Sequence, residues 1–247
     1  MNRHRLNRNM APTAIIMSIE PHPSVSITPR LRLWQLISPT LPVGAFAYSQ
    51  GLEYAIYRNW VRNSEDTLNW IQGVTEHALC ATDVPALHRL YLAWQDNDKP
   101  RLDYWNAWLL ACRNTQELRH EDVNTGKALA RLLNSLQLAE AGPWLQRRDT
   151  TYLCMLALAA SRWDILLDDI AQGFLWSWSE NQVTTAMKLV PLGQTEGQTL
   201  LSQLMKTLPA SAAHGLTLND EDMGYGAPGQ TLASSWHETQ YSRLFRS

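Results

Sequence analysis

Proline residues at well-spaced positions restrict how this chain can fold more than any other feature. Between them, apolar residues recur with the 3.6-residue period of a helix, as in residues 64–81 and 101–118, and Asn63 or Ser64 is placed to cap the first of these. Each proline removes a backbone donor and clashes with the preceding turn, so helices are expected to break there. Breaks are predicted at Pro39, Pro42, Pro85, Pro100, Pro143, Pro191 and Pro209.

Runs in which β-branched and polar residues alternate are absent, so the pattern predicts an all-α protein, a single-domain helical bundle of about ten helices. Further periodic runs cover roughly 85–97, 121–140, 150–160, 163–179, 181–190 and 195–208. Residues 1–29, rich in Pro and Ser, are expected to form a disordered leader before an all-helical domain at 30–210. Residues 211–247 are expected to be a flexible linker, without periodicity to residue 235, followed by a C-terminal stretch at 236–247 that binds a partner.

Charge and composition exclude several classes of protein. The formal charge of −2 offers no basic surface for nucleic acid. No stretch reaches the roughly eighteen apolar residues that a membrane span requires, so we expect no membrane association. Cys80, Cys112 and Cys154 lie in apolar helical sequence and are typical of buried thiols in a reducing compartment, which favours a cytoplasmic protein.

Motifs for catalysis or metal binding are missing from the sequence. There is no phosphate-binding loop, no G-x-S-x-G elbow, no H-E-x-x-H pair and no C-x-x-C. The cluster most like a metal site is "RHED", residues 119–122, whose neighbouring side chains point to different sides of a helix and are typical of a solvated face with ion pairs. We therefore expect no cofactor and no metal site.

Polar residues stand in unexpected places in two segments. "SPTLPVGAFAYSQGLEYAI", residues 38–56, opens with two prolines and carries Gly51 where a helix is predicted, which is either a tolerated defect or a point of close backbone approach. "LVPLGQTEGQTLL", residues 189–201, is a helix joint rich in Gly, Thr and side-chain amides. Gly126 in the central helix is expected to allow a close helix crossing.

Four stretches, in this order, closely resemble the urease accessory protein family UreF. "SPTLPVGAFAYSQGLE" is similar to the signature with which members open their first long helix, and "TQELRHEDVNTGKALARLL" to their central helix. "NQVTTAMKLVPLGQTEGQ" is similar to their Pro-Leu-Gly-Gln joint, and "HETQYSRLFRS" to their carboxyl terminus. Lys188 stands where many members have arginine, which keeps the charge but loses the planar fork.

The resemblance implies a chaperone of urease maturation that is not an enzyme. Members of the family are helical dimers that bridge the urease-bound protein UreD, also called UreH, to the GTPase UreG, which carries nickel to the active site of the urease apoprotein. The expected partners are therefore UreD/UreH, UreG, the urease apoprotein and a second copy of this chain. The residues expected to bind partners are Tyr48, Glu53, Lys188, Pro191, Gly193, Gln194, Tyr241, Arg243, Leu244, Phe245 and Arg246.

Two detailed hypotheses follow for these residues. Lys188, with the joint at 191–194, is expected to lie beside Tyr48 and Glu53 on a surface that serves the dimer or receives UreG; otherwise the joint is only a well-made turn. The stretch 236–247 is expected not to order alone, because fixing its backbone costs about 1–2 kcal/mol per residue, and to fold when UreD supplies a groove. A frayed terminus without a role is the alternative.

Two other classes of protein remain open at this stage. One is a hydrolase or transferase that uses Glu53 together with Glu117 or Glu121 as its acid and base. The other is a helical ligand-binding or regulatory bundle, in which the runs "WLQRRDTTYL" and "FLWSWSE" would line a pocket.

Overall fold

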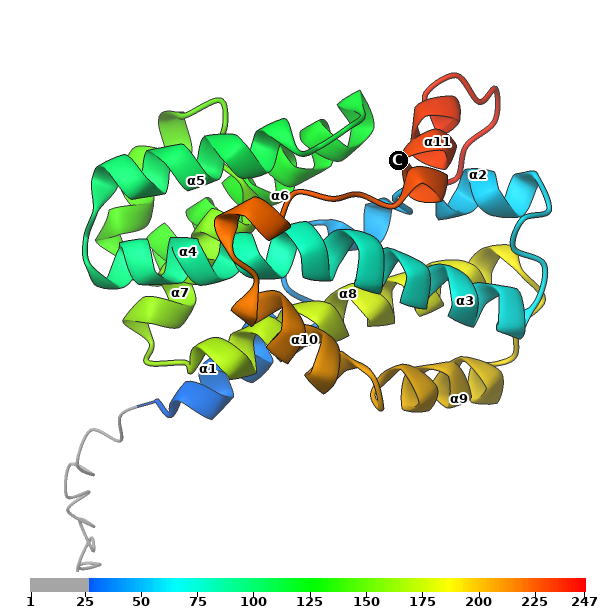
Figure 1. Ribbon diagram of the computed structural model, residues 1–247, viewed down its shortest axis with the longest axis horizontal. Helices are drawn as coiled ribbons and strands as arrows, with labels where there is room; N and C mark the ends of the chain where they lie inside the picture. Colours follow the sequence, from blue (N-terminus) through cyan, green and yellow to red (C-terminus); the bar gives the residue numbers. More distant parts are fainter. Residues whose placement is uncertain (1–26) are drawn as a thin grey trace, which may run out of the picture.

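The computed structural model describes residues 27–247, which form eleven α-helices and no strand (Figure 1). The predicted all-α bundle of about ten helices is confirmed. The helices are α1 Pro29–Leu36, α2 Leu52–Tyr57, α3 Ser64–Val74, α4 Val84–Gln95, α5 Lys99–Ala111, α6 Gln116–Ser135, α7 Tyr152–Arg162, α8 Leu167–Leu189, α9 Gln194–Leu204, α10 Leu208–Thr217 and α11 Pro228–His237. The 3₁₀ turns η1 Ala45–Ala47, η3 Ala139–Gln146 and η4 Asp220–Asp222 and the π-helical segment η2 Thr75–Asp83 complete the described elements.

Helix starts follow the local sequence signals. The Asn63 side chain accepts a hydrogen bond from the backbone N–H of Asp66 and caps α3, as predicted. Pro100 and Pro209 lie in the first turns of α5 and α10, where a missing N–H costs nothing. Pro191 follows the end of α8.

The expected break at Pro85 does not occur. Segments α3, η2 and α4 follow one another directly and form one long rod across the molecule (Figure 1). The wide π turns of η2 come immediately before Pro85, which lies in the first turn of α4. Because the hydrogen-bond register changes there, the chain accommodates a residue without an N–H and continues as a helix. The two runs predicted at 163–179 and 181–190 are likewise one helix, α8.

The main hydrophobic core lies around α4 and α7. Helix α7 has the sequence YLCMLALAASR and is buried along 153–160, as expected for a helix that is apolar on every side. Helix α4 packs against it and also contacts α5, α8 and α10. Leu87 and Leu90 of α4 and Leu156 of α7 are almost completely buried.

Gly126 of α6 confirms the predicted close approach, although its neighbour is not the middle of a helix. A Cβ atom added at Gly126 would lie 2.5 Å from the backbone carbon of Thr151, the residue that caps α7. Any larger residue would push α6 away from the start of α7.

A second, smaller apolar cluster joins α2, α8 and α11. It consists of Leu52, Ala55, Val61, Ala186 and Ala233. Figure 1 shows α2 and α11 together at one end of the rod, with the C-terminus beside them. This end of the molecule carries the candidate site.

Residues 211–235 differ from the expected linker, because they contain most of α10, η4 and most of α11. The buried positions of α11 are Gln230, Ala233, Ser234 and His237, which have helical spacing. Polar and small residues occupy this buried face, so a search for apolar periodicity does not detect it. The helix is held by specific contacts rather than by a hydrophobic stripe.

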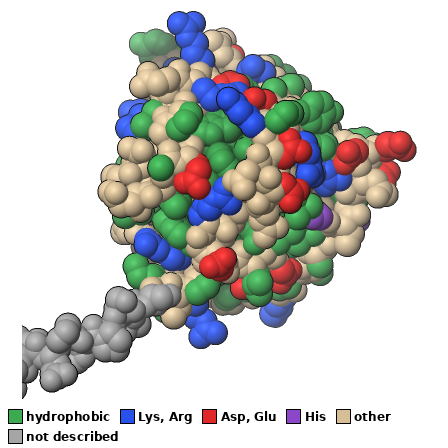
Figure 2. All heavy atoms as spheres, turned by 90° about the vertical axis from the view of Figure 1, so that its left-hand side faces the viewer, with side chains coloured by type: hydrophobic (Ala, Val, Ile, Leu, Met, Phe, Trp, Pro, Cys, Tyr) green, Lys and Arg blue, Asp and Glu red, His purple; other side chains and the backbone are tan. Residues whose placement is uncertain are grey.

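The predicted leader, residues 1–29, lies outside the described residues up to position 26, and Pro29 already begins α1. Within the described part, no helix combines the length and apolar character needed to cross a bilayer. On the face drawn in Figure 2, acidic and basic side chains are interspersed. The three cysteines are free thiols; Cys80 and Cys154 are buried as expected, whereas Cys112 is only partly so.

Candidate functional site

Residues 44–53, here called the signature loop, include η1 and run to the first turn of α2. Gly51 is not inside a helix, because it caps the start of α2 with φ +87°. A Cβ atom there would lie 2.8 Å from the backbone nitrogen of Ser234 and 3.1 Å from the carbonyl oxygen of Gln230. The position therefore needs glycine both for its left-handed backbone and for the close approach of α11.

The chain beyond α11, residues 238–247, is here called the tail, and it lies on the signature loop. The backbone N–H groups of Ser49 and Gln50 donate to a backbone oxygen of Ser247 at 2.6 and 3.1 Å, and the Ser49 hydroxyl donates to the same oxygen. The N–H of Arg246 donates to the carbonyl oxygen of Ala47 at 2.8 Å. These hydrogen bonds hold the last residues of the tail against the signature loop.

The side chain of Glu53, in α2, binds the backbone of the tail. Its carboxylate accepts the backbone N–H of Leu244 at 2.7 Å and that of Phe245 at 2.9 Å. The same carboxylate lies 3.1 Å from Nε2 of His237. Glu53 is buried, so its charge depends on these donors in place of water.

His237, the last residue of α11, is fully buried between two carboxylates. Its Nε2 faces Glu53, and its Nδ1 lies 2.9 Å from Glu117 of α6. Glu117 also accepts a hydrogen bond from the Arg243 guanidinium of the tail at 2.8 Å. Only an imidazolium donates from both ring nitrogens, so the geometry favours protonated His237. We call Glu53, Glu117, His237 and Arg243 the charge cluster.

Burial alone lowers the pKa of His237, because it removes water from the charged ring. Hydrogen bonds and charges from Glu117 and Glu53 outweigh burial, so the pKa of His237 is raised above its usual value of 6.5. Next to the cluster, the Glu238 carboxylate accepts the backbone N–H groups of Gln116 and Glu117 at 2.9 and 3.3 Å. The start of the tail thus satisfies free donors at the start of α6.

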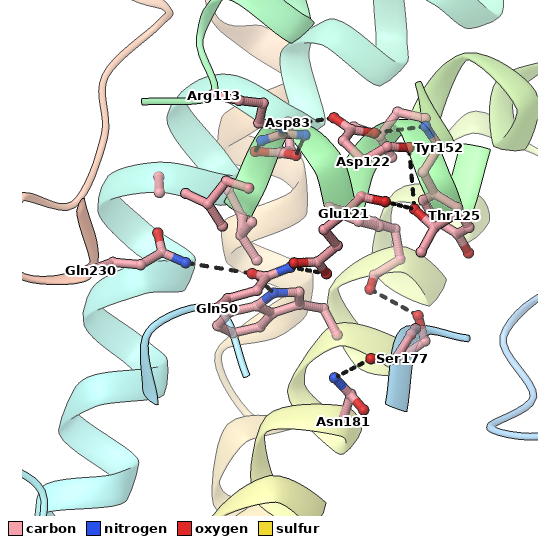
Figure 3. Close-up of a pocket in the computed structure, with 17 residues that line it drawn as sticks. Gln50, Asp83, Arg113, Glu121, Asp122, Thr125, Tyr152, Ser177, Asn181 and Gln230 are labelled. Atoms are coloured by element: carbon pink, nitrogen blue, oxygen red, sulfur yellow. Dashed lines mark hydrogen bonds and ion pairs between the residues drawn. The ribbon is translucent and has the colours of Figure 1, made fainter. Parts of the chain in front are cut away.

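A cavity of about 130 Å³ lies under the signature loop, between α6, α8 and the end of η2 (Figure 3). Gln50 forms part of the cavity wall. The amide nitrogen of Gln50 donates to Glu121 of α6 at 2.7 Å, and its amide oxygen accepts from the indole of Trp178 at 2.8 Å. The Ser247 hydroxyl reaches Glu121 at 3.2 Å. Burial raises the pKa of Glu121 to about 7, against the opposing hydrogen bond from Gln50.

Arg113 forms the other charged side of the cavity. Its guanidinium donates to Asp83 at 2.7 and 3.2 Å and to Asp122 at 2.7 Å (Figure 3). Asp122 accepts in turn the backbone N–H of Tyr152 at 2.7 Å, at the start of α7. The described residues include no group of three His, Cys, Asp or Glu side chains arranged to hold a metal ion. Through Asp83 and Asp122, Arg113 joins the end of η2 to α6, and Asp122 joins α6 to the start of α7.

The structure places the residues predicted on the first signature in the interior. Tyr48 and Glu53 are 5% and 7% exposed, so they do not form an open surface in the free chain. The Tyr48 hydroxyl accepts a hydrogen bond from Asn124 at 3.3 Å. The sequence predicted that Tyr48 and Glu53 lie on a surface, but both side chains are buried.

The residues predicted at the α8–α9 joint are exposed, and only part of the expected neighbourhood forms. The Lys188 ammonium lies 5.4 Å from the ring centre of Phe245, one of the two residues whose backbone N–H groups Glu53 accepts. Pro191, Gly193 and Gln194 are exposed, and no hydrogen bond between described residues joins them to Tyr48 or Glu53. Lys188 reaches the tail rather than the first signature itself.

The tail is ordered on its own chain, contrary to expectation. Phe245 is 6% exposed, and its backbone N–H donates to the Glu53 carboxylate. Tyr241, by contrast, is fully exposed and Leu244 is 65% exposed, and the side chains of Arg243 and Arg246 also reach the surface. The hydrogen-bonding groups that the sequence assigned to a partner are thus supplied by the chain itself, and the side chains of Tyr241 and Leu244 remain exposed.

Sequence reasoning missed the partners of the tail. His237 was not singled out, and Glu117 and Glu121 entered only as a candidate acid–base pair with Glu53. The available signal was the four-residue spacing of Glu117 and Glu121 on a helix whose other buried positions, such as Thr125 and Leu129, follow the same face. Carboxylates repeated on the inner face of a helix indicate buried partners.

Fold and site together define an all-helical protein whose candidate site is a peptide segment docked onto its own chain through buried charges. The sequence profile of the UreF family matches residues 61–205. Proteins named urease accessory protein UreF are similar over most of the chain. That of Alkalilimnicola ehrlichii is 53% identical over 94% of this chain and 100% of its own length. That of Hahella chejuensis is 50% identical over 88% of this chain and 97% of its own. The chain belongs to the UreF family of urease accessory proteins.

Proposed function

We propose that this protein is a chaperone of urease maturation that acts as an adaptor and not as an enzyme. In this proposal it joins UreD, also called UreH, to the GTPase UreG so that nickel reaches the urease apoprotein, and it works in the cytoplasm as a homodimer. Membership of the UreF family supports the link to urease. Three free cysteines are consistent with a reducing compartment.

The observation that carries the adaptor function is the outward face of the docked tail. Tyr241 and Leu244 project from a segment whose backbone is fixed by Glu53 and the signature loop. Tyr and Arg are residue types that dominate binding energy at protein interfaces. A tail already held in one conformation also loses less entropy on binding than a free peptide, so it is suited to capture a partner.

The cavity under the signature loop is small for a ligand pocket. Its volume of about 130 Å³ is below the roughly 300–1,000 Å³ of typical ligand pockets. Both aromatic runs contribute to the cavity wall, one through Tyr152 and the other through Trp178, whereas Trp144 packs against Trp94 in the core. Glu53 and Glu117 are both bonded to His237, so their role in the free chain is to hold the tail.

Co-elution with UreD tests the proposal. A chain that lacks residues 239–247 keeps all of α11, whereas a deletion that begins before residue 237 would shorten that helix. The truncated chain should keep the helical circular dichroism of the full chain but should no longer co-elute with UreD on size exclusion. The double variant Tyr241→Ala with Leu244→Ala should weaken UreD binding at least tenfold without altering the melt, because both side chains are exposed. Tyr104→Ala, at a tyrosine 60% exposed on α5, is the control. Equal co-elution of all variants would reject the assignment of the tail.

Recruitment of UreG is tested separately at the joint. Lys188→Ala should reduce binding of UreG to the complex with UreD, because Lys188 is the exposed cation beside the tail. Tyr48→Phe removes only the hydroxyl that Asn124 contacts and serves as a variant of the buried side. A Lys188→Ala variant that binds UreG with wild-type affinity would remove the joint from the proposed interface.

A further inference from the structure

The charge cluster is the most concentrated set of buried titratable groups that touches the tail. Two carboxylates, Glu53 and Glu117, are balanced by the imidazolium of His237 and the guanidinium of Arg243. His237 is completely buried, and both carboxylates are less than one-tenth exposed. Water therefore contributes little to their solvation, and the balance depends on the proton of His237.

Loss of that proton acts directly on the tail. A neutral imidazole donates from one nitrogen only, so either Glu53 or Glu117 would face a lone pair. Glu53 is the carboxylate that holds the backbone N–H groups of Leu244 and Phe245. An unbalanced, buried Glu53 gains by turning toward water, and that movement breaks both hydrogen bonds to the tail.

Every element packed against the cluster adds charge of a known sign. Glu53 comes from α2, Glu117 from α6 and Arg243 from the tail. Glu238, at the end of α11, lies beside Glu117 through its bonds to the α6 backbone. Further along the tail, Lys188 of α8 lies over Phe245, and Glu121 of α6 reaches Ser247.

We propose that His237 is a proton-controlled latch: its imidazolium holds the tail on the signature loop, and loss of the proton releases residues 239–247 from the body of the protein. The latch would change the presentation of the tail by pH alone. It goes beyond the adaptor function, since it does not depend on which partner the tail meets.

The direction of the pH dependence follows from the two shifted groups. His237 has a folded-state pKa above 6.5, so its stabilisation of the docked tail is complete below pH 6.5 and is lost as pH rises through the folded pKa. Burial raises the pKa of Glu121 from 4.5 to about 7, so the stability that its protonated form gives the folded chain is lost as pH rises between these values. The Ser247 hydroxyl favours the charged form of Glu121, so Glu121 does not release the tail, and His237 controls release above neutrality.

Fluorine NMR on the full chain measures this release directly. The sequence contains three phenylalanines, and the buried Phe245 and Phe174 and the exposed Phe46 are spread over the tail, the core and the signature loop. In protein labelled with 4-fluorophenylalanine and assigned with Phe245→Leu, the Phe245 signal should be at a buried position at pH 6. It should move toward the position of Phe46 by pH 9, with the ratio of released to docked tail rising about tenfold per pH unit within the transition. Phe174 should keep a buried signal throughout.

Variants assign the transition to one group. His237→Gln should abolish the change of the Phe245 signal above pH 6.5, whereas His214→Gln, at an exposed site on α10, should retain it. Glu121→Gln should also retain the transition above pH 7. Arg243→Gln, at a side chain 39% exposed, should increase the released fraction at pH 6 without unfolding the core.

Several results would overturn the latch. One is a wild-type Phe245 signal that stays buried from pH 6 to pH 9, a result that needs no variant to fold. Another is an unchanged transition in His237→Gln together with its loss in Glu121→Gln, which would make Glu121 the controlling group. An Arg243→Gln protein with wild-type docking at pH 6 would show that the charge cluster does not hold the tail.

Discussion

The core around α4 and α7 and the unit formed by α2, α11 and the tail are held together in different ways. In the core, Leu90 and Leu156 are surrounded by apolar side chains, and α7 carries Leu, Ala, Met and Cys on every side. The unit of α2, α11 and the tail has an apolar cluster of only five buried residues. Its other contacts include backbone hydrogen bonds, the charge cluster and the packing of Tyr54 against Trp236.

This difference separates overall stability from local control. Apolar burial is non-directional and does not depend on protonation, so the core should respond to volume changes and not to pH. Buried ion pairs add little net stability but lose much when one partner changes. The molecule can thus release its tail without unfolding its bundle.

The largest effect is expected in the core. Leu90→Ala should lower the free energy of unfolding by about 2–5 kcal/mol, because it leaves a cavity at a fully buried position. Urea unfolding followed by circular dichroism measures this loss, which should be the same at pH 6 and pH 8.5. Leu232→Ala, at a position 47% exposed on α11, should stay within about 0.5 kcal/mol of the wild type. A pH-dependent loss in Leu90→Ala would break the comparison.

A smaller effect is expected where α11 meets the signature loop. Gly51→Ala should cost about 1–2 kcal/mol locally, since alanine is strained at φ +87° and its Cβ would meet the backbone of Ser234. Trypsin should therefore cleave after Arg243 faster than in the wild type, while the melt of the bundle changes little. Gly73→Ala, inside α3 with no atom within 4 Å of the added Cβ, should leave cleavage unchanged and stabilise the helix slightly. Equal cleavage of both variants would show that α11 does not fix the tail.

The smallest effect is expected at Lys188. Its ammonium lies over the ring of Phe245 at an exposed site, where such a contact contributes about 0.5–1 kcal/mol. Lys188→Ala should raise the rate of tryptic cleavage after Arg243 by a factor of roughly two to five. Lys206→Ala, exposed near the end of α9, removes the same charge away from the tail and should have no effect. If both variants were cleaved faster to a similar degree, the effect would come from the loss of a positive charge and not from the contact of Lys188 with Phe245.

The sequence predicted those parts of the fold that depend on apolar periodicity. Residues 64–74 form α3 with the expected cap, and Ile71 and Val74 of this helix are buried. The described residues form a helical bundle without strands, as predicted. The sequence did not predict helix α11, because its buried face includes the polar residues Gln230, Ser234 and His237, and a search for apolar periodicity does not detect them.

The candidate site was predicted in its segments but not in its contacts. The first signature, the central helix and the carboxyl terminus do meet, through Glu53, Glu117 and Phe245. The backbone entropy of the tail outweighs the burial of its own apolar side chains, and for this reason the sequence predicted that the tail does not order alone. The donors and acceptors of the signature loop add hydrogen bonds that this comparison does not include. Those depend on residues nearly two hundred positions away, such as Ser49, and no local pattern contains them.

Hydrogen exchange of the full chain at pH 6 and pH 8.5, corrected for intrinsic rates, tests the central claim most directly. The account predicts that the amides of α4 and α7 keep the same protection at both values. It also predicts that the amides of Leu244 and Phe245, which donate to Glu53, are protected at pH 6 and lose most of that protection at pH 8.5. Protection of these two amides that is equal at both pH values, or a parallel loss in α4 and α7, would contradict a tail held separately by the charge cluster.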